Sequence, residues 1–319
     1  MKVLITGAEG FVGPYLLEAL VSAGHDAVGT SQHGSTGPAL DLLESRDAAR
    51  VIDEIAPDAV VHLAAVSAVP AAAKDPDLAW RVNVEGVRRL SSAFANRRPD
   101  GVFLFVSTGA VYGASGGGVP IDETHPRSAA NSYASTKVAA EAWLEAQTLA
   151  DDRDRWPRTV IARPFNHVGA GQGSEFALAG FARQIAEGER QGNGAANAPI
   201  RVATGNLDVR RDFLDVRDVV SAYVSLLETE AARGVFNICS GESHRIGDLL
   251  DRLIERTPCP VEVVTESARL RLGDRDGVLA SCQKLREVTG WKPQVNLADT
   301  LSEILEDWRE RVGSPIGAD

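Results

Sequence analysis

The chain has 319 residues, of which 44% are hydrophobic and 24% are charged, and its formal net charge is −11. This length and composition predict a soluble globular protein with one large domain and a smaller lobe. The acidic balance argues against nucleic acid or an anionic membrane surface as a partner. A negatively charged small molecule would therefore have to meet a local basic patch.

Signals for targeting and for metal binding are not expected. The first hydrophobic run follows Met1 and Lys2 at once, and no apolar run approaches the ~20 residues of a membrane span, so we expect a cytoplasmic protein. Cys239, Cys259 and Cys282 lack the spacing of metal ligands. We therefore expect reduced thiols and no metal site.

The first expected elements are a buried strand at residues 2–6 and a helix over residues 11–24, with Gly7, Gly10 and Gly13 at the turn between them. Glycine at such a turn lets the backbone approach a pyrophosphate, and the helix N-terminus offers free amides to it. The spacing is G-x-x-G-x-x-G. In the first strand-turn-helix of a chain it favours a nucleotide site over a purely structural turn.

The same alternation of a hydrophobic run and a helical pattern recurs along the chain. The further pairs are 26–30 with 45–56, 59–63 with 76–96, 102–107 with 132–150, and 158–163 with 174–188, and a sixth strand is expected at 235–238. Such alternation predicts an α/β fold, a Rossmann-type, doubly wound parallel sheet with helices on both faces. After residue 164 the pattern changes to Gly-rich and polar segments, which predict a smaller lobe.

Tyr133 and Lys137 lie four residues apart in a stretch rich in Ala, Glu and Leu, so both side chains are expected on one face of a helix. An ammonium near a phenol lowers the pKa of the phenol, which makes it usable as a general acid or base. The alternative is a surface tyrosine. The preceding strand ends in the hydroxyls of Ser107 and Thr108, and this position favours the catalytic interpretation.

Several blocks in a fixed order resemble the extended short-chain dehydrogenase/reductases that act on nucleotide sugars. Besides the glycine turn and the Tyr-x-x-x-Lys pair they are His62-Leu63-Ala64-Ala65, Asn83-Val84-Glu85-Gly86, Val111-Tyr112-Gly113, Arg163-Pro164-Phe165-Asn166 and Gly290-Trp291-Lys292-Pro293. The resemblance runs nearly end to end. It implies an NAD(P)-binding Rossmann domain at 1–164 plus about 213–239, and an interwoven nucleotide-sugar-binding lobe at about 165–212 and 240–319.

The resemblance also implies the residues that hold the cofactor. They are Gly7, Gly10, Phe11, Val12, Gly13, Ser31, His33, Asp41, Leu42, Leu63, Ala64, Ala65, Tyr133, Lys137 and Pro164. Because the second strand ends without the acid typical of NAD-preferring relatives, and Ser31 or His33 could donate to a 2′ phosphate, we expect NADP(H) to be preferred and NAD(H) to be possible. Asp41 would accept from the adenine amino group. Its alternative role is a helix N-cap.

The residues after Thr108 bear on the reaction. Relatives that remove water from the sugar place acidic groups there, whereas this chain has Gly109 and Ala110, which disfavours a 4,6-dehydratase. Thr108, Tyr133 and Lys137 suffice for hydride and proton transfer at a secondary alcohol or ketone. Thr108 could instead cap the strand end.

Two segments of the lobe, 162–172 and 205–216, resemble the GDP-4-keto-6-deoxy-D-mannose reductases of this family, which make GDP-D-rhamnose. That resemblance implies a GDP-linked 4-keto-6-deoxy sugar as the partner. Its contacts would be Thr108, Asn166, Gln172, Arg211, Arg271 and Asp274, with arginine forks on the diphosphate. Arg211 could instead pair with Asp212 or Asp215. The sequence Arg-Leu-Gly-Asp at 271–274 departs from the family's Arg-Pro-x-Glu.

Two rival functions stay open at this point. The first is a nucleotide-sugar 4-epimerase, which uses the same three residues with a retained NAD. The second is an NADP-binding redox sensor without catalysis, although such proteins commonly lose the tyrosine or the lysine and this chain keeps both. The family also implies a homodimer through the helices at about 76–96 and 132–150.

Overall fold

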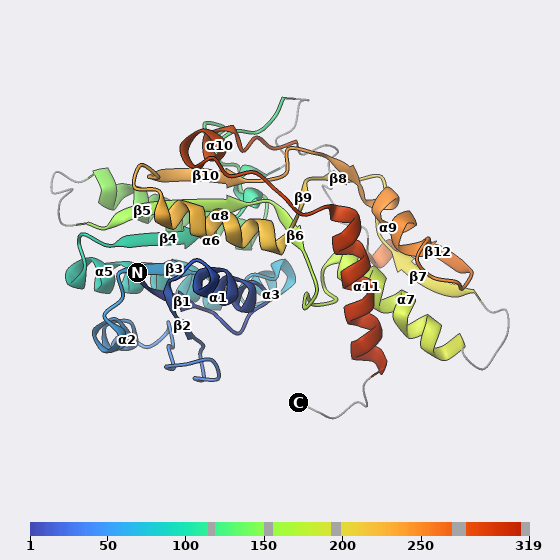
Figure 1. Cartoon of the computed structure of the whole chain (residues 1–319), viewed down its shortest axis with the longest axis horizontal. Helices are drawn as coiled ribbons and strands as arrows, with labels where there is room; N and C mark the ends of the chain where they lie inside the picture. The colour runs from blue at the N-terminus through green and yellow to red at the C-terminus, as the bar shows by residue number, and fades with distance from the viewer. Residues whose placement is uncertain (114–118, 150–155, 193–198, 270–278, 314–319) are drawn as a thin grey trace.

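The computed structural model describes residues 1–113, 119–149, 156–192, 199–269 and 279–313. Its centre is a six-stranded parallel sheet in the order β10-β5-β4-β3-β1-β2 (Figure 1). The strands are β1 (Lys2–Thr6), β2 (Asp26–Thr30), β3 (Ala59–His62), β4 (Val102–Val106), β5 (Arg158–Pro164) and β10 (Gly234–Ile238). This arrangement confirms the predicted α/β class and includes the sixth strand, which pairs with β5.

Helices cover both faces of the sheet (Figure 1). On one face lie α1 (Val12–Ser22) and α8 (Val216–Glu228), and on the other lie α2 (Asp47–Ile55), α5 (Gly86–Arg97) and α6 (Ser132–Leu149). Two clusters of buried apolar residues correspond to the two faces. Burying both faces explains why the strands are almost continuously hydrophobic.

The sheet has a topological switch point at β1, because β2 pairs with one side of it and β3 with the other. In open α/β sheets, ligands bind in the crevice outside the carboxyl ends of the strands at such a point. The turn after β1 and the segment after β3 border this crevice. A parallel bridge between Ser31 and Ala39 extends the sheet by a short stretch beyond β2.

The region predicted as one helix over 76–96 is divided. It contains α4 (Pro76–Trp80), a π-helical turn η1 (Arg81–Glu85) and then α5, preceded by α3 (Val69–Lys74). The buried Asn83 lies in the π-turn, accepts from Val66 N at 2.8 Å and donates to Thr136 Oγ1 at 3.0 Å. Asn83 therefore ties the segment after β3 to α6, and π-turns often occur at functional sites.

The remaining elements form a smaller unit with an apolar cluster of its own. Its helices are α7 (Ala177–Gly192), α9 (Ile246–Ile254) and α11 (Leu297–Gly313). Its strands pair as β6 (Asn166–Val168) with β9 (Phe213–Asp215), β7 (Ile200–Thr204) with β12 (Val261–Thr265), and β8 (Arg210–Arg211) with β11 (His244–Arg245).

One segment that the sequence assigned to the lobe packs elsewhere. The helix α10 (Gln283–Thr289) lies beside β10, with Leu285 and Trp291 in an apolar cluster of the large sheet. Lys284 Nζ donates to Val235 O at 2.6 Å, and Trp291 Nε1 donates to Ser221 Oγ at 2.9 Å. The segment with α10 thus packs on the large sheet, and the domain limits stay a prediction.

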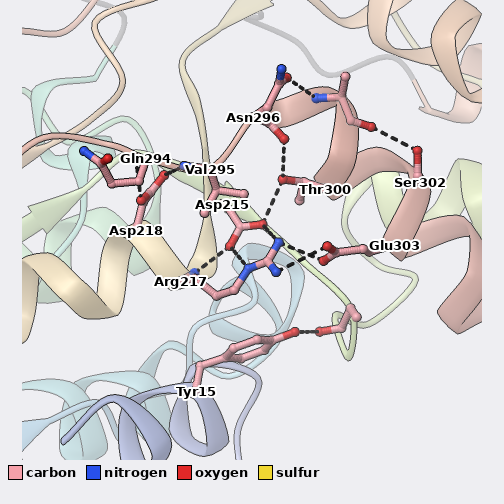
Figure 2. A network of polar contacts seen from close by, with 12 residues as sticks. Tyr15, Asp215, Arg217, Asp218, Gln294, Val295, Asn296, Thr300, Ser302 and Glu303 are labelled. Atoms are coloured by element: carbon pink, nitrogen blue, oxygen red, sulfur yellow. Dashed lines mark hydrogen bonds and ion pairs between the residues drawn. The ribbon is translucent and has the colours of Figure 1, made fainter. Parts of the chain in front are cut away.

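A polar network joins the two units at the start of α8 (Figure 2). The buried Asp215 accepts from Arg217 N at 2.7 Å and pairs with the Arg217 guanidinium, while Thr300 Oγ1 of α11 donates to Asp215 at 2.8 Å. Arg217 also pairs with Glu303 of α11 at 2.7 Å. The lobe helix α11 is thus tied to α8 by charge-assisted contacts.

No helix within the described part of the chain is long and apolar enough to cross a membrane.

Candidate active site

The turn after β1 has no room for side chains at two of its glycines. Gly7 has a φ of +70°, and a Cβ there would lie 2.8 Å from Ala64 N. A Cβ on Gly13 would lie 2.1 Å from Ala8 O. Glycine at these positions is therefore needed for the turn and for the close contact between α1 and the turn.

The start of α1 suits an anionic group. Phe11 precedes the helix without a side-chain cap, and its first turn, which Val12 opens, contains no acidic residue. The first amides of a helix have no partner within it, and their partial positive charge favours phosphate. Gly10 beside them is exposed. These residues fit the pyrophosphate of a dinucleotide.

The far side of the crevice is built from the segment after β3. Leu63 N donates to Thr6 O at 3.2 Å and Ala64 N to Thr6 Oγ1 at 3.3 Å, which brings Ala64 next to Gly7, with Ala65 following it in the chain. His62 is fully buried and bonds Thr6 Oγ1 at 2.7 Å. Burial and the nearby charge of Lys137 lower the pKa of His62 to about 3, so this ring is neutral and structural.

An acidic residue that no sequence pattern indicates lies beside the segment after β2. Ser31 is buried, and its hydroxyl bonds Ser35 Oγ at 2.9 Å. Ser35 donates in turn to Glu9 at 2.7 Å, so a carboxylate from the glycine turn lies beside this segment. His33 is exposed. Of the two predicted donors, Ser31 is therefore already engaged, while His33 faces solvent.

Asp41 caps a turn. Its Oδ1 accepts from Leu43 N at 2.9 Å, and α2 begins only at Asp47. The alternative role of Asp41 as a helix N-cap is therefore wrong. The Leu42 side chain is buried in the core against Gly86, so any contact of Leu42 with a cofactor would involve its backbone.

Thr108, Tyr133 and Lys137 come together where β4 ends and α6 begins. Thr108 caps a short 3-10 turn (Gly109–Tyr112) by accepting from Ala110 N at 3.2 Å, and its hydroxyl also acts to lower the pKa of Tyr133. The cap and the contact with Tyr133 coexist. Lys137 is buried, with Nζ donating to Val106 O at 2.8 Å and lying 6.0 Å from the centre of the Tyr133 ring.

The acid–base properties of this pair differ from the sequence-based expectation. Burial raises the pKa of Tyr133 to about 12, and the hydrogen bond with Thr108 opposes this rise. Burial lowers the pKa of Lys137 to about 7, and the charge of Glu141 opposes that change. The expected lowering of the tyrosine pKa is wrong for this chain, because desolvation is the largest influence on the phenol and raises its pKa. Tyr133 is protonated at neutral pH and poised as a proton donor.

The residues expected to bind the substrate lie at the border of sheet and lobe. Asn166 is exposed and donates to Asp212 O at 2.9 Å, next to the partly exposed Arg211. Pro164 is buried at the end of β5. Gln172 is also buried, and its Nε2 donates to His167 O at 2.9 Å. Asn166 and Arg211 are therefore adjacent and accessible, while Gln172 supports its own loop.

The proposed ion pairs of Arg211 are replaced by other contacts of the two carboxylates. Asp215 pairs with Arg217, and Asp212 accepts from Ser240 N at 2.8 Å and Gly241 N at 2.9 Å. Burial raises the pKa of Asp212 to about 6, and these hydrogen bonds oppose the rise. Arg271 and Asp274 lie outside the described residues.

Two further residues border the site. The His167 ring stacks on Phe11 with centroids 6.1 Å apart, and Tyr15 OH donates to Ala170 O at 2.8 Å (Figure 2). The loop after β6 is therefore held over the start of α1. Neither residue has a spacing signal in the sequence, because these contacts join segments more than 150 residues apart. Among the described residues, no three His, Cys, Asp or Glu side chains are placed to hold a metal ion.

A glycine turn at the switch point of a parallel sheet, with a half-buried tyrosine and a buried lysine paired after the fourth strand, defines a dinucleotide-binding enzyme of the short-chain dehydrogenase/reductase type. A sequence model of the NAD dependent epimerase/dehydratase family matches residues 3–239. The chain belongs to this family. The membership confirms the resemblance found in the sequence.

Relatives extend over the whole chain. GDP-6-deoxy-D-mannose reductase of Pseudomonas aeruginosa is 38% identical over 317 residues, covering 98% of each chain. UDP-glucose 4-epimerase of Rhizobium leguminosarum bv. trifolii is 30% identical over 334 residues, covering 97% of each. The structure of RMD from Pseudomonas aeruginosa complexed with NADPH has a TM-score of 0.85 and 36% identity, covering 98% of this chain and all of that one.

Proposed function

We propose that this protein reduces the 4-keto group of GDP-4-keto-6-deoxy-D-mannose with NAD(P)H and yields GDP-D-rhamnose. The observation that carries the proposal is the site itself, with a protonated Tyr133 beside Thr108 and Lys137 and no acidic residue directly after Thr108. The similarity to the Pseudomonas reductase over 98% of both chains supports the choice of substrate.

The chain's own residues provide the proton chemistry. A bound nicotinamide dinucleotide would supply the hydride for carbon 4. Tyr133 would donate its hydroxyl proton to the carbonyl oxygen, and Thr108 would hydrogen-bond the same oxygen as negative charge develops on it. The Lys137 ammonium would stabilise the tyrosinate that remains. A tyrosine that is protonated at neutral pH suits the direction of reduction.

The position after Thr108 disfavours dehydration on steric grounds as well. A Cβ on Gly109 would lie 2.9 Å from the Phe165 ring. Any acidic side chain at residue 109 would therefore displace Phe165, which packs against Tyr112 with ring centroids 6.2 Å apart. A 4,6-dehydratase needs an acid and a base that this segment does not provide.

For the binding groups we propose the following roles. The glycine turn, Phe11, Val12 and the segment 63–65 would bind the dinucleotide, whereas Asn166 and Arg211 would contact the nucleotide sugar, with Arg211 on the diphosphate. We also propose that NADPH is preferred over NADH, as the structure of the Pseudomonas relative with NADPH supports. The negative charge of Glu9 beside Ser35 would repel a 2′ phosphate and so weaken the preference for NADPH.

The experiment is to follow absorbance at 340 nm with GDP-4-keto-6-deoxy-D-mannose and either NADPH or NADH, and to identify the product sugar by NMR. We expect net consumption and GDP-D-rhamnose. A 4-epimerase, which the 30% identical UDP-glucose 4-epimerase keeps as the second candidate, would show no net consumption and would retain NAD on purification. Binding of NADPH without turnover of any nucleotide sugar would indicate a redox sensor.

We further propose a homodimer through α4, α5 and α6. Trp80 of α4 is 47% exposed and borders a shallow depression lined by small residues, among them Ala129, Ala130 and Ser135. An exposed tryptophan beside such a depression suits a second copy of the chain. Light scattering after gel filtration should give a dimer for the native chain and a monomer for Trp80→Arg. A native monomer would contradict this proposal.

A further inference from the structure

A fully buried carboxylate lies behind the proposed catalytic pair. Tyr133, Lys137 and Glu141 follow one another at intervals of four residues on α6, so their side chains share one side of the helix. Lys137 is 2% exposed and Glu141 is 0% exposed. A buried carboxylate is costly unless it is paired, so its position demands an explanation.

Both oxygens of Glu141 are used. Oε1 accepts from Arg163 Nε at 2.9 Å and from the Ser107 hydroxyl, and Oε2 accepts from Arg163 Nη2 at 2.6 Å and from Arg127 Nη1 at 3.1 Å. Ser107 directly precedes Thr108. Glu141 therefore fixes the carboxyl end of β4 at the residue next to the proposed oxyanion donor.

Arg163 extends the same network along β5. Its Nη1 donates to Tyr112 OH at 2.7 Å, and Tyr112 OH donates to Asn237 Oδ1 at 2.7 Å. Arg163 and Glu141 form a bidentate pair in the interior, the strongest geometry for such a contact. The network thus reaches from α6 across β5 to β10.

The Lys137 amine is surrounded by groups from α6, β3 and β4. On α6 they are Tyr133 and Glu141, on β3 the neutral His62, and on β4 the Val106 carbonyl and the Phe105 ring, whose centre is 4.7 Å from Nζ. Burial disfavours the charged amine. The negative charge of Glu141 favours the charged amine and raises the pKa of Lys137.

We propose that Glu141 is a positioning residue for the reaction, because its charge stabilises the Lys137 ammonium while its oxygens fix Ser107 next to Thr108. The proposal rests on the function proposed above, since it concerns the same Tyr-Lys pair. A competing explanation is that Glu141 serves only as a structural partner of Arg163. The two explanations differ in what happens to Lys137 when the carboxylate loses its charge.

Three variants separate these explanations. Glu141→Gln removes the charge but keeps the size and an acceptor for Ser107. Arg163→Gln breaks the same ion pair but leaves the carboxylate, which Arg127 still neutralises in part. The double variant with both substitutions avoids a buried unpaired charge and keeps the test possible if one single variant does not fold. Thermal unfolding of each protein reports whether it is folded.

Two measurements are made against pH for each protein, the dissociation constant of NADPH by fluorescence and kcat/KM for the keto sugar. Both should worsen as pH rises through the pKa of Lys137, because the neutral amine is a weaker donor and carries no charge. For Glu141→Gln we expect the midpoint to move to lower pH by about one unit relative to the native chain, and for the double variant we expect a midpoint below that of Arg163→Gln. For Arg163→Gln we expect no shift to lower pH.

Equal midpoints in the double variant and in Arg163→Gln would overturn the proposal, because the network would then act through structure alone. The NADPH measurement needs no sugar. If the native chain did not reduce the keto sugar, the proposed function would fail, and the NADPH midpoints would still decide the role of Glu141.

Discussion

Tyr133 occupies an environment that keeps its proton on at neutral pH, since burial raises its pKa to about 12 and the neighbouring Lys137 is itself buried. Tyr133→Phe removes the hydroxyl and leaves the ring. We expect turnover to fall by about 10²- to 10⁴-fold, the usual contribution of a general acid. The affinity for NADPH and the thermal stability should change little. Steady-state kinetics and NADPH fluorescence test this, and near-native turnover would exclude Tyr133 as the proton donor.

Glu9 offers a second test at the scale of one residue. Its carboxylate binds Ser35 in the segment after β2, where the 2′ phosphate of NADPH is expected. Glu9→Gln removes a negative charge there, and about 1 kcal/mol of repulsion corresponds to roughly a fivefold gain in the preference for NADPH over NADH. The ratio of the two kcat/KM values measures it. Glu18→Gln, an exposed position on α1, is the control, and an equal change there would refute the effect.

Single residues were predictable where one element decides their placement. Tyr133 and Lys137 share a helix face, so helical spacing alone predicts their juxtaposition. The Glu9 contact with Ser35 and the stacking of His167 on Phe11 join separate segments, and no local pattern encodes them. The pKa of Tyr133 was predicted in the wrong direction because the degree of burial is a property of the folded chain.

At the scale of elements, two glycines of the turn between β1 and α1 have different roles, Gly13 in packing and Gly10 in binding. A Cβ on Gly13 would lie 2.1 Å from Ala8 O, whereas on Gly10 the nearest neighbour would be Gly7 O at 3.3 Å. We expect Gly13→Ala to lower the free energy of unfolding by about 1–3 kcal/mol, as overpacking does. Gly10→Ala should stay close to native stability but bind NADPH more weakly. Thermal unfolding and NADPH titration distinguish the two, and equal destabilisation would contradict this assignment.

The regular elements followed from sequence periodicity, since strands buried on both faces and helices with one apolar face leave clear patterns. The interruption of the helix over 76–96 was not predictable from periodicity. It coincides with Asn83, whose amide bridges Val66 and Thr136, so the π-turn depends on tertiary partners rather than on local propensity. The short strands of the lobe have two to five residues and were equally hard to predict.

At the scale of the whole molecule, the chain crosses between the sheet and the lobe more than once. The sequence predicted this interweaving by resemblance, yet α10 returned to the large sheet because Leu285 and Trp291 are buried against it. The apolar surface that a helix covers is determined by the tertiary fold, so sequence periodicity alone does not predict it. The nucleotide sugar would contact groups from both units, so their relative position matters for its binding.

The contact between Thr300 and Asp215 tests that dependence. Thr300→Val removes the charge-assisted hydrogen bond from α11 to Asp215, which ends β9 and caps the start of α8, and leaves Arg217 of α8 on the carboxylate (Figure 2). We expect the free energy of unfolding to fall by about 1.5–3 kcal/mol. The KM for the nucleotide sugar should rise several-fold while the NADPH affinity, which depends on the sheet, stays native. Ser302→Ala on the same helix, which loses contacts inside the lobe only, is the control. An unchanged KM in Thr300→Val would show that the junction does not position the substrate lobe, and so would an equal rise in Ser302→Ala. A rise in KM confined to Thr300→Val would link the geometry of the junction to sugar binding.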